Sequence, residues 1–143
     1  MQVRVVIDTC VWVAAIRSNK GASYRVLSLI GSERFDFGIS VALYLEYKQS
    51  LLRTAKEGAT ALSDAQVDAV LAALAHFADE VPVYYTLRPN LRDPNDDMVF
   101  ECAAHYGASH IVTFNTADFA GQELPGYGIQ AIRPARFLEM LEE

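Results

Sequence analysis

Acidic side chains occur at four places in this chain where an apolar run ends or a helical segment begins. Asp8 directly follows an apolar run, and Glu46 lies within a later helical segment. Asp96 and Asp97 lie at the start of another helical segment, and Asp118 follows a short apolar run. Converging carboxylates repel one another, and a bound cation removes that repulsion. If the four segments meet at one edge of the fold, these acids form a cation site.

The types of side chain available predict which cation would bind. A site of Asp and Glu without His or Cys suits the hard cations Mg²⁺ and Mn²⁺. His76, His105 and His110 form no pair at metal-ligand spacing, and we interpret Cys10 and Cys102 as buried thiols. We therefore expect one or two Mg²⁺ or Mn²⁺ ions as the cofactor.

Each acid also has a simpler interpretation when it is considered alone. Asp8 could cap the helix that follows it, and Asp93 is well explained as the cap of its own helix. Glu46 fits a solvated helix face. Asp96 and Asp97 fall in a first helical turn, where acids complement the helix dipole. Only the combination of all these acids favours a metal site.

The hydrophobic pattern predicts the elements that position the acids. Strands are expected at residues 2–7, 35–40, 81–85, 109–113 and 128–132, with helices at 10–16, 23–30, 41–56, 64–77, 94–106 and 134–141, and a polar connection at 114–118. This alternation predicts a three-layer α/β/α fold with a central, mostly parallel five-stranded sheet. Ligands of such sheets bind beyond the carboxyl ends of the strands, where the acids would then lie.

Local signals refine three of these elements. Ser40 is expected to cap the helix at 41–56, and Ser63 with Gln66 fits a capping box before the helix at 64–77. Pro82 inside the third strand suggests an edge position in the sheet. The predicted apolar stripe of the helix at 41–56 consists of Val41, Tyr44, Leu45, Leu51, Leu52 and Ala55.

Composition excludes several classes of protein. The formal net charge of −6 argues against attachment to nucleic acid through net positive charge, although bound cations would change the local field. A hydrophobic fraction of 52% with 21% charged residues is that of a globular protein, and 143 residues fit a single domain, residues 1–143. There is no apolar run of about 18 residues and no signal-peptide pattern, so we expect no membrane association and a cytoplasmic location.

Several motifs, in their order and spacing, resemble the PIN domain. They are Val6-Ile7-Asp8-Thr9, Glu46 in the third helix, Asp93-Pro94-Asn95-Asp96-Asp97-Met98-Val99-Phe100-Glu101-Cys102-Ala103, and Ile111-Val112-Thr113-Phe114-Asn115-Thr116-Ala117-Asp118-Phe119. The resemblance covers essentially the whole chain and is strongest to the PIN-type (VapC-like) toxin ribonucleases of prokaryotic toxin–antitoxin systems. It implies the three-layer PIN-like fold and a metal-dependent endoribonuclease that hydrolyses phosphodiester bonds of single-stranded or structured RNA.

The resemblance also implies roles for particular acids. The family's catalytic and metal-binding acids map onto Asp8, Glu46, Asp97 and Asp118. Asp97 is preferred to Asp96 because the family's acid directly precedes the apolar helical run. The bound ions would activate a water and stabilise the departing oxygen, with Asp8 as the candidate bridge between two ions.

Supporting polar residues surround these acids in the sequence. Asn115 stands where some family members carry Asp, and its amide could orient a water or a neighbouring carboxylate. Thr9 and Thr113 could donate hydrogen bonds to the carboxylates or to a substrate phosphate, or they could be ordinary hydroxyls at strand ends. Tyr44 and Tyr47 could stack on bases, although their helical spacing favours a core position.

The expected partners are RNA, an antitoxin protein that covers the acids, and a second copy of the chain in a homodimer. Two strips of positive charge are candidate RNA contacts, or else solvated surface: Arg17, Lys20 and Arg25, and Lys48, Arg53 and Lys56. Two alternatives remain open: a catalytically weak module of the same fold that binds RNA or protein, which Asn115 keeps in play, and a housekeeping RNA-processing nuclease.

Other strand-end chemistries lack their defining residues. A phospho-acceptor receiver domain requires an acidic pair after the first strand and a late lysine, but Asp8-Thr9-Cys10 contains one acid and no lysine follows Lys56. A dehalogenase-type phosphatase requires an aspartate at the position of Cys10. A dinucleotide-binding protein requires Gly-x-Gly-x-x-Gly after the first strand, which is absent.

Overall fold

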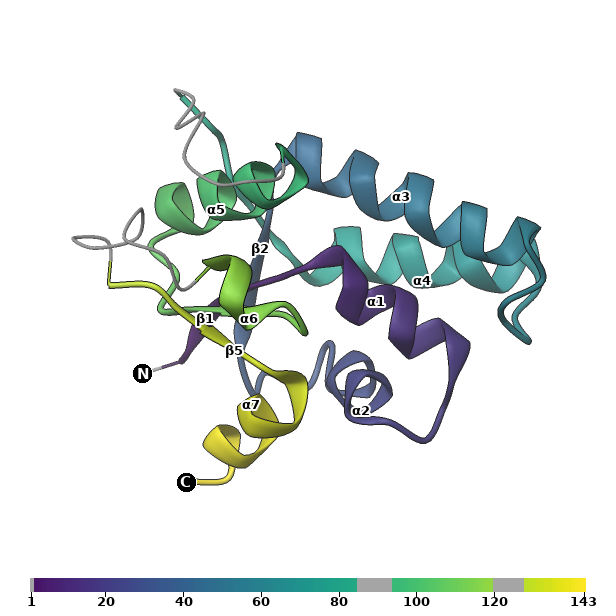
Figure 1. Ribbon diagram of the computed structural model, residues 1–143, viewed down its shortest axis with the longest axis horizontal. Helices are drawn as coiled ribbons and strands as arrows, with labels where there is room; N and C mark the ends of the chain where they lie inside the picture. Colours follow the sequence, from purple (N-terminus) through teal and green to yellow (C-terminus); the bar gives the residue numbers. More distant parts are fainter. Residues whose placement is uncertain (1, 85–93, 120–127) are drawn as a thin grey trace.

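The computed structural model describes residues 2–84, 94–119 and 128–143, which form a parallel sheet covered by helices (Figure 1). Within these ranges the sheet has five strands: β1 (Arg4–Ile7), β2 (Asp36–Ile39), β3 (Asp79–Glu80), β4 (His110–Val112) and β5 (Gln130–Ile132). Their spatial order is β3-β2-β1-β4-β5, and every neighbouring pair is parallel. The predicted fold class is confirmed, with β1 at the centre.

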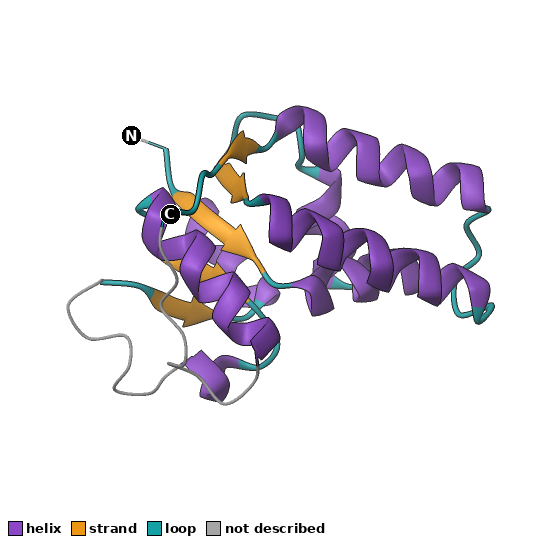
Figure 2. Cartoon of the chain, turned by 90° about the horizontal axis from the view of Figure 1, so that it is seen from above, coloured by secondary structure: helices purple, strands orange, loops and turns teal. Residues whose placement is uncertain are grey.

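The described helices are α1 (Thr9–Arg17), α2 (Ala22–Ser28), α3 (Val41–Lys56), α4 (Asp64–Phe77), α5 (Pro94–Tyr106), α6 (Thr116–Phe119) and α7 (Pro134–Leu141). Helices α3 and α4 run side by side away from the sheet, as both views show (Figure 1, Figure 2). No described helix is long and apolar enough to cross a membrane.

Successive residues of β2 contact opposite layers of helices. The Phe37 ring packs on Trp12 of α1, with ring centroids 6.4 Å apart. The next residue, Gly38, lies against Tyr106 of α5, and a Cβ atom at Gly38 would be only 2.8 Å from the Tyr106 ring. Because strand residues alternate between faces, α1 and α5 cover opposite faces of the sheet. Val5 of β1 is fully buried between these layers.

The signals at helix ends act as the sequence predicts. The Ser40 hydroxyl accepts a hydrogen bond from the Leu43 N–H at 3.2 Å, and Ser63 and Gln66 form the reciprocal capping box of α4. Helix α5 ends before Gly107, whose φ of 73° is in the left-handed region that glycine adopts without strain.

The third strand is shorter and earlier than predicted. Strand β3 comprises only Asp79 and Glu80, rather than residues 81–85, of which residue 85 lies outside the described residues. The Val81 N–H still donates to the Ile39 carbonyl at 3.0 Å, but Pro82 has no N–H with which to continue the ladder. The predicted edge position of this strand is confirmed.

Two further predictions were wrong in part. The buried side of α3 carries Leu43, Tyr47 and Leu51, whereas Val41 and Leu45 of the predicted stripe are exposed. The helix has apolar residues on two sides, and its neighbours α1, α4 and α5 decide which side is covered. The expected polar connection at 114–118 contains the first residues of α6.

Tyr47 ties α3 to the end of the central strand, because its fully buried hydroxyl donates to the Ile7 carbonyl. We expect Tyr47→Phe to lower the free energy of unfolding by about 1–3 kcal/mol, since the mutant loses a buried hydrogen bond. Urea unfolding followed by circular dichroism measures this loss. Tyr44→Phe, at a half-buried position of the same helix, is the matched control, and equal losses in the two mutants would contradict the assignment.

Candidate functional site

The two central strands end side by side at the carboxyl edge of the sheet. Strand β1 passes into α1 through Asp8, and β4 continues into Thr113. The Asp8 N–H donates to the Val112 carbonyl at 2.9 Å, and the Thr113 N–H donates to the Ile132 carbonyl at 2.9 Å. These backbone bonds hold Asp8 and Thr113 side by side.

The Asp8 side chain is bonded to the residue that follows β4 and does not cap its own helix. Asp8 occupies the N-cap position of α1, with φ −68° and ψ 146°, but its carboxylate makes no capping hydrogen bond. The Thr113 hydroxyl donates to Asp8 Oδ2 at 2.7 Å, and the Cys10 thiol donates to the same oxygen at 3.4 Å. Helix capping therefore does not explain the position of this carboxylate.

Burial makes the charged form of Asp8 unfavourable. The side chain is buried, and desolvation raises the pKa of its carboxyl above the ordinary value. The hydrogen bonds from Thr113, Cys10 and the Thr9 backbone lower this pKa, whereas the nearby Asp118 carboxylate raises it further. Such a carboxylate is stabilised as an anion when a cation binds beside it.

Cys10 is a half-buried thiol beside Asp8. Burial, and secondarily the Asp8 charge, raises the pKa of Cys10 to about 11, so the group is a neutral donor at pH 7. Cys102 is also buried, with a pKa raised by burial to about 11. Both cysteines are free thiols, and neither is expected to be a thiolate ligand at neutral pH.

Helix α5 brings three buried acids to the layer above the central strands. Asp96, Asp97 and Glu101 are 8%, 4% and 4% exposed, and α5 packs against β1, α3 and α6. Sequence reasoning missed Glu101, although its i+4 spacing from Asp97 places both acids on one face of the helix. Asp93, predicted as the cap of α5, lies outside the described residues.

The segment after β4 places Asn115 and Asp118 close to Asp8. The Asn115 N–H donates to the Thr113 hydroxyl at 3.0 Å, and the Asn115 carbonyl accepts from the Asp118 N–H at 3.0 Å. Both side chains are exposed, and the Asp118 charge is near enough to Asp8 to raise its pKa. Thr113 is thus bonded to Asp8 on one side and to the Asn115 turn on the other.

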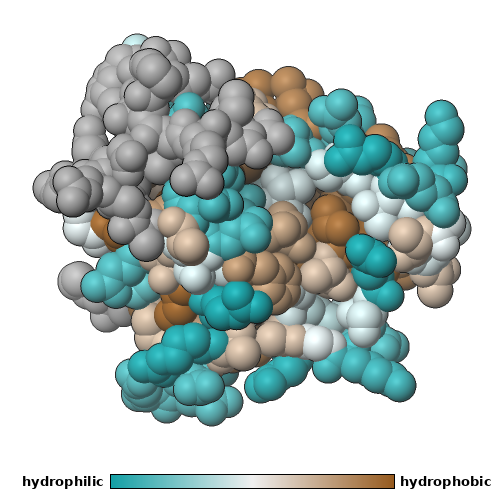
Figure 3. Space-filling model, viewed as in Figure 1, coloured by the Kyte–Doolittle hydropathy of each residue, from teal (hydrophilic) through white to brown (hydrophobic). Residues whose placement is uncertain are grey.

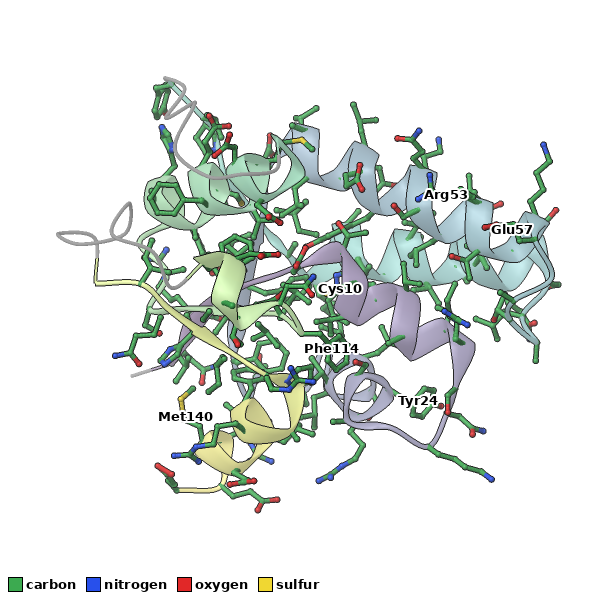
Figure 4. The ribbon with its side chains drawn as sticks, in the orientation of Figure 1. Cys10, Tyr24, Arg53, Glu57, Phe114 and Met140 are labelled. Carbon is green, nitrogen blue, oxygen red and sulfur yellow. The ribbon has the colours of Figure 1, made fainter. Side chains whose placement is uncertain are left out.

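Glu46 lies on the wall of a groove between α1 and α3, with a volume of about 640 Å³. The Ser50 hydroxyl donates to Glu46 Oε1 at 3.1 Å and orients it. Cys10 and Phe114 lie at one end of this groove, and α3 carries Arg53 toward the other, as the labelled side chains show (Figure 4). The groove therefore begins beside Asp8.

The predicted supporting residues separate into two groups. Thr9 and Arg17 line the groove beside Glu46, and Arg17 also lines a second cavity beside α2. Lys20 lines only this second cavity, of about 620 Å³, and Lys48 is an exposed residue of α3 that is not part of the groove wall. Sequence reasoning missed Cys10 and Phe114 as groove residues, because an isolated thiol and an isolated phenylalanine carry no local signal. Tyr47 is a core residue, as its spacing favoured.

Comparison with protein families agrees with this arrangement. The PIN domain pattern matches residues 4–117 of the 143, which include β1, α3, α5 and β4. This chain belongs to the PIN domain family. PIN domains are generally metal-dependent nucleases, so the fold is of nuclease type. No curated protein matches the chain. The match contains Asp8, Glu46 and Asp97 and ends one residue before Asp118.

The donor atoms of this PIN domain suit a hard divalent cation. Asp8 and Asp118 offer carboxylate oxygens at the carboxyl edge, and the charge of Asp118 raises the pKa of Asp8. In the described ranges, no three His, Cys, Asp or Glu side chains are grouped closely enough to form a complete metal-binding cluster. The chemistry of the donors therefore fits a divalent cation.

The pKa of Asp8 predicts a specific pH dependence of stability for this PIN domain. A raised pKa means that Asp8 contributes full stability below its unfolded value of 3.8 and loses that contribution as pH rises through the folded value. We expect Asp8→Asn, which stays neutral, to melt at a higher temperature than wild type in EDTA at pH 7. Each 1 kcal/mol of difference corresponds to about 2–4 °C in a domain of this size.

Thermal unfolding between about pH 3 and pH 8 measures this effect. The two melting temperatures should converge below about pH 4, where wild-type Asp8 is also neutral. Asp68→Asn, at an exposed position of α4, is the control and should track wild type. A constant difference between Asp8→Asn and wild type over the whole range would contradict the assigned cause.

Proposed function

We propose that this PIN domain is an Mg²⁺- or Mn²⁺-dependent endoribonuclease that acts as the toxin of a toxin–antitoxin pair. The observation that carries the proposal is the placement of Asp8. Its carboxylate is buried, makes no capping bond, and is held by Thr113 at the carboxyl edge next to a groove. A structural aspartate in that position would be expected to cap α1 instead.

The surrounding residues supply complementary parts of this chemistry. Thr113 fixes the orientation of Asp8 through its hydrogen bond, and Ser50 fixes Glu46 in the same way. Asp97 lies in the first turn of α5, and Asp118 lies in α6. A divalent cation held by these acids would lower the pKa of the attacking water and stabilise the departing oxygen of the phosphodiester.

The groove supports a nucleic-acid substrate. Arg17 of α1 and Arg53 of α3 both line it, although the chain as a whole carries a net charge of −6. Two positively charged arginine side chains beside a carboxylate site match a substrate whose backbone carries repeated negative charge. RNA is preferred to DNA because of the family resemblance, and a comparison of matched RNA and DNA oligonucleotides tests that preference.

The toxin role extends to partners. We propose an antitoxin protein that covers the acids and a second copy of this chain in a homodimer. Val41 and Leu45 of α3, which are 71% and 57% exposed, support an additional interface. Induced expression should arrest bacterial growth, and Asp8→Asn should not. Light scattering that shows a monomer at all concentrations would contradict the dimer.

The nuclease proposal makes a direct prediction. The purified chain should cleave single-stranded RNA in Mg²⁺ or Mn²⁺, and EDTA should abolish cleavage. Asp8→Asn should reduce the rate at least about a hundredfold, because it removes a negatively charged ligand and leaves the fold intact. Labelled oligonucleotides resolved on denaturing gels measure both rates.

Asp68→Asn is the matched control for this experiment. It makes the same chemical change at an exposed position of α4, away from the groove wall, and should cleave at the wild-type rate. If wild type and Asp8→Asn cleave at the same EDTA-resistant rate, the activity is a contaminant and the proposal is wrong.

One observation favours a second candidate function, a catalytically weak binding module. No complete group of three metal-binding side chains occurs within the described part of the chain, and Asn115 stands where some family members carry Asp. A Mn²⁺ titration by calorimetry separates the candidates. Saturable binding near pH 7 that Asp8→Asn removes supports the nuclease, and no saturable binding supports the module.

A further inference from the structure

The groove between α1 and α3 extends beyond the part that the proposed chemistry uses. Glu46 and Arg53 both line it and lie seven residues apart on α3, which corresponds to roughly 10 Å along the helix axis. Ser50 lies between them and is bonded to Glu46. A substrate bound at the acids could therefore continue along the groove toward Arg53.

Positive charge faces this extension from both helices. Arg17 ends α1 and Arg53 lies in the last turns of α3, and both residues are exposed. In the described part of the chain the ion pairs involve Arg136, and neither groove arginine forms one. Glu57, at the end of α3, also lines the groove and limits the positive stretch. Two arginines that are not ion-paired favour an anionic ligand.

The end of the groove nearest the acids carries an aromatic ring. Phe114 is half-buried, and the Arg133 guanidinium lies 5.4 Å from its ring centroid. The same arginine donates to the Phe114 carbonyl at 2.8 Å, which holds the residue in place. Figure 3 shows hydrophobic side chains at the centre of this face of the molecule and hydrophilic ones toward the ends of α1 and α3. An aromatic ring next to arginines is a typical platform for an unpaired nucleotide.

We propose that this groove binds the unpaired RNA strand on one side of the cleaved bond, with a base stacked on Phe114 and phosphates at Arg17 and Arg53. Only the position of the cleaved bond rests on the proposed function. A concave site of about 640 Å³ is in the size range of small-ligand sites, which favours a single strand over a duplex. Unstacked bases of single strands are also what aromatic side chains bind in RNA.

The binding experiment uses Asp8→Asn protein, so that cleavage does not interfere, and a short fluorescein-labelled single-stranded oligoribonucleotide. Adding Arg53→Gln should weaken binding about tenfold and reduce the slope of log affinity against log salt by about 0.7. Phe114→Leu should weaken binding about tenfold without changing that slope. Arg136→Gln, the same change at an exposed position of α7, should leave both quantities unchanged.

Three results would overturn the inference: equal affinities for the Arg53→Gln and Arg136→Gln proteins, equal affinities for single-stranded and duplex RNA, or displacement of the RNA by a poly-glutamate peptide at comparable concentration. The last result would identify the groove as a site for acidic peptides. If wild type fails to cleave RNA but the predicted binding pattern is observed, the proposed nuclease function fails and the groove assignment stands. If wild type cleaves and Arg53→Gln leaves KM unchanged, only the groove assignment fails.

Discussion

The hydrogen bond from Thr113 to Asp8 is the contact on which the candidate site depends. It joins the ends of the two central strands at a heavy-atom distance of 2.7 Å, and the Asp8 carboxylate makes no capping hydrogen bond to α1. The same hydroxyl accepts from the Asn115 N–H, so the turn that leads to Asp118 is positioned by the same atom. Parallel pairing of β1 with β4 makes this contact possible, because it aligns their carboxyl ends.

The carboxyl edge of the sheet and the groove beside it favour ligands of opposite charge. At the sheet edge, burial and a neighbouring carboxylate make the charge of Asp8 unfavourable, which favours binding of a cation. Along the groove, Arg17 and Arg53 have the opposite sign and favour an anion. A net charge of −6 therefore excludes general attraction to nucleic acid but not a local site. This division explains how an acidic protein could bind RNA.

Local sequence signals were sufficient for most of the fold. The caps at Ser40 and Ser63 and the glycine at position 107 act through neighbouring residues, and the helix boundaries that they predict are correct. Errors occurred where a distant partner decides the outcome. Strand β3 starts at Asp79 because that residue pairs with β2, and the covered side of α3 depends on the helices packed against it. Neither partner is visible in the local pattern.

For the site, the sequence by itself determined which acids follow the strands and begin the helices, because strand and helix periodicities are local properties. Only the tertiary structure decided how the side chains are used. It oriented Asp8 toward Thr113, placed Cys10 and Phe114 at the groove, and put Arg17 between that groove and a second cavity, which Lys20 also lines. The physical reason is that these placements depend on how α1 and α3 pack beside the sheet, and that packing sums contacts between residues far apart in the chain.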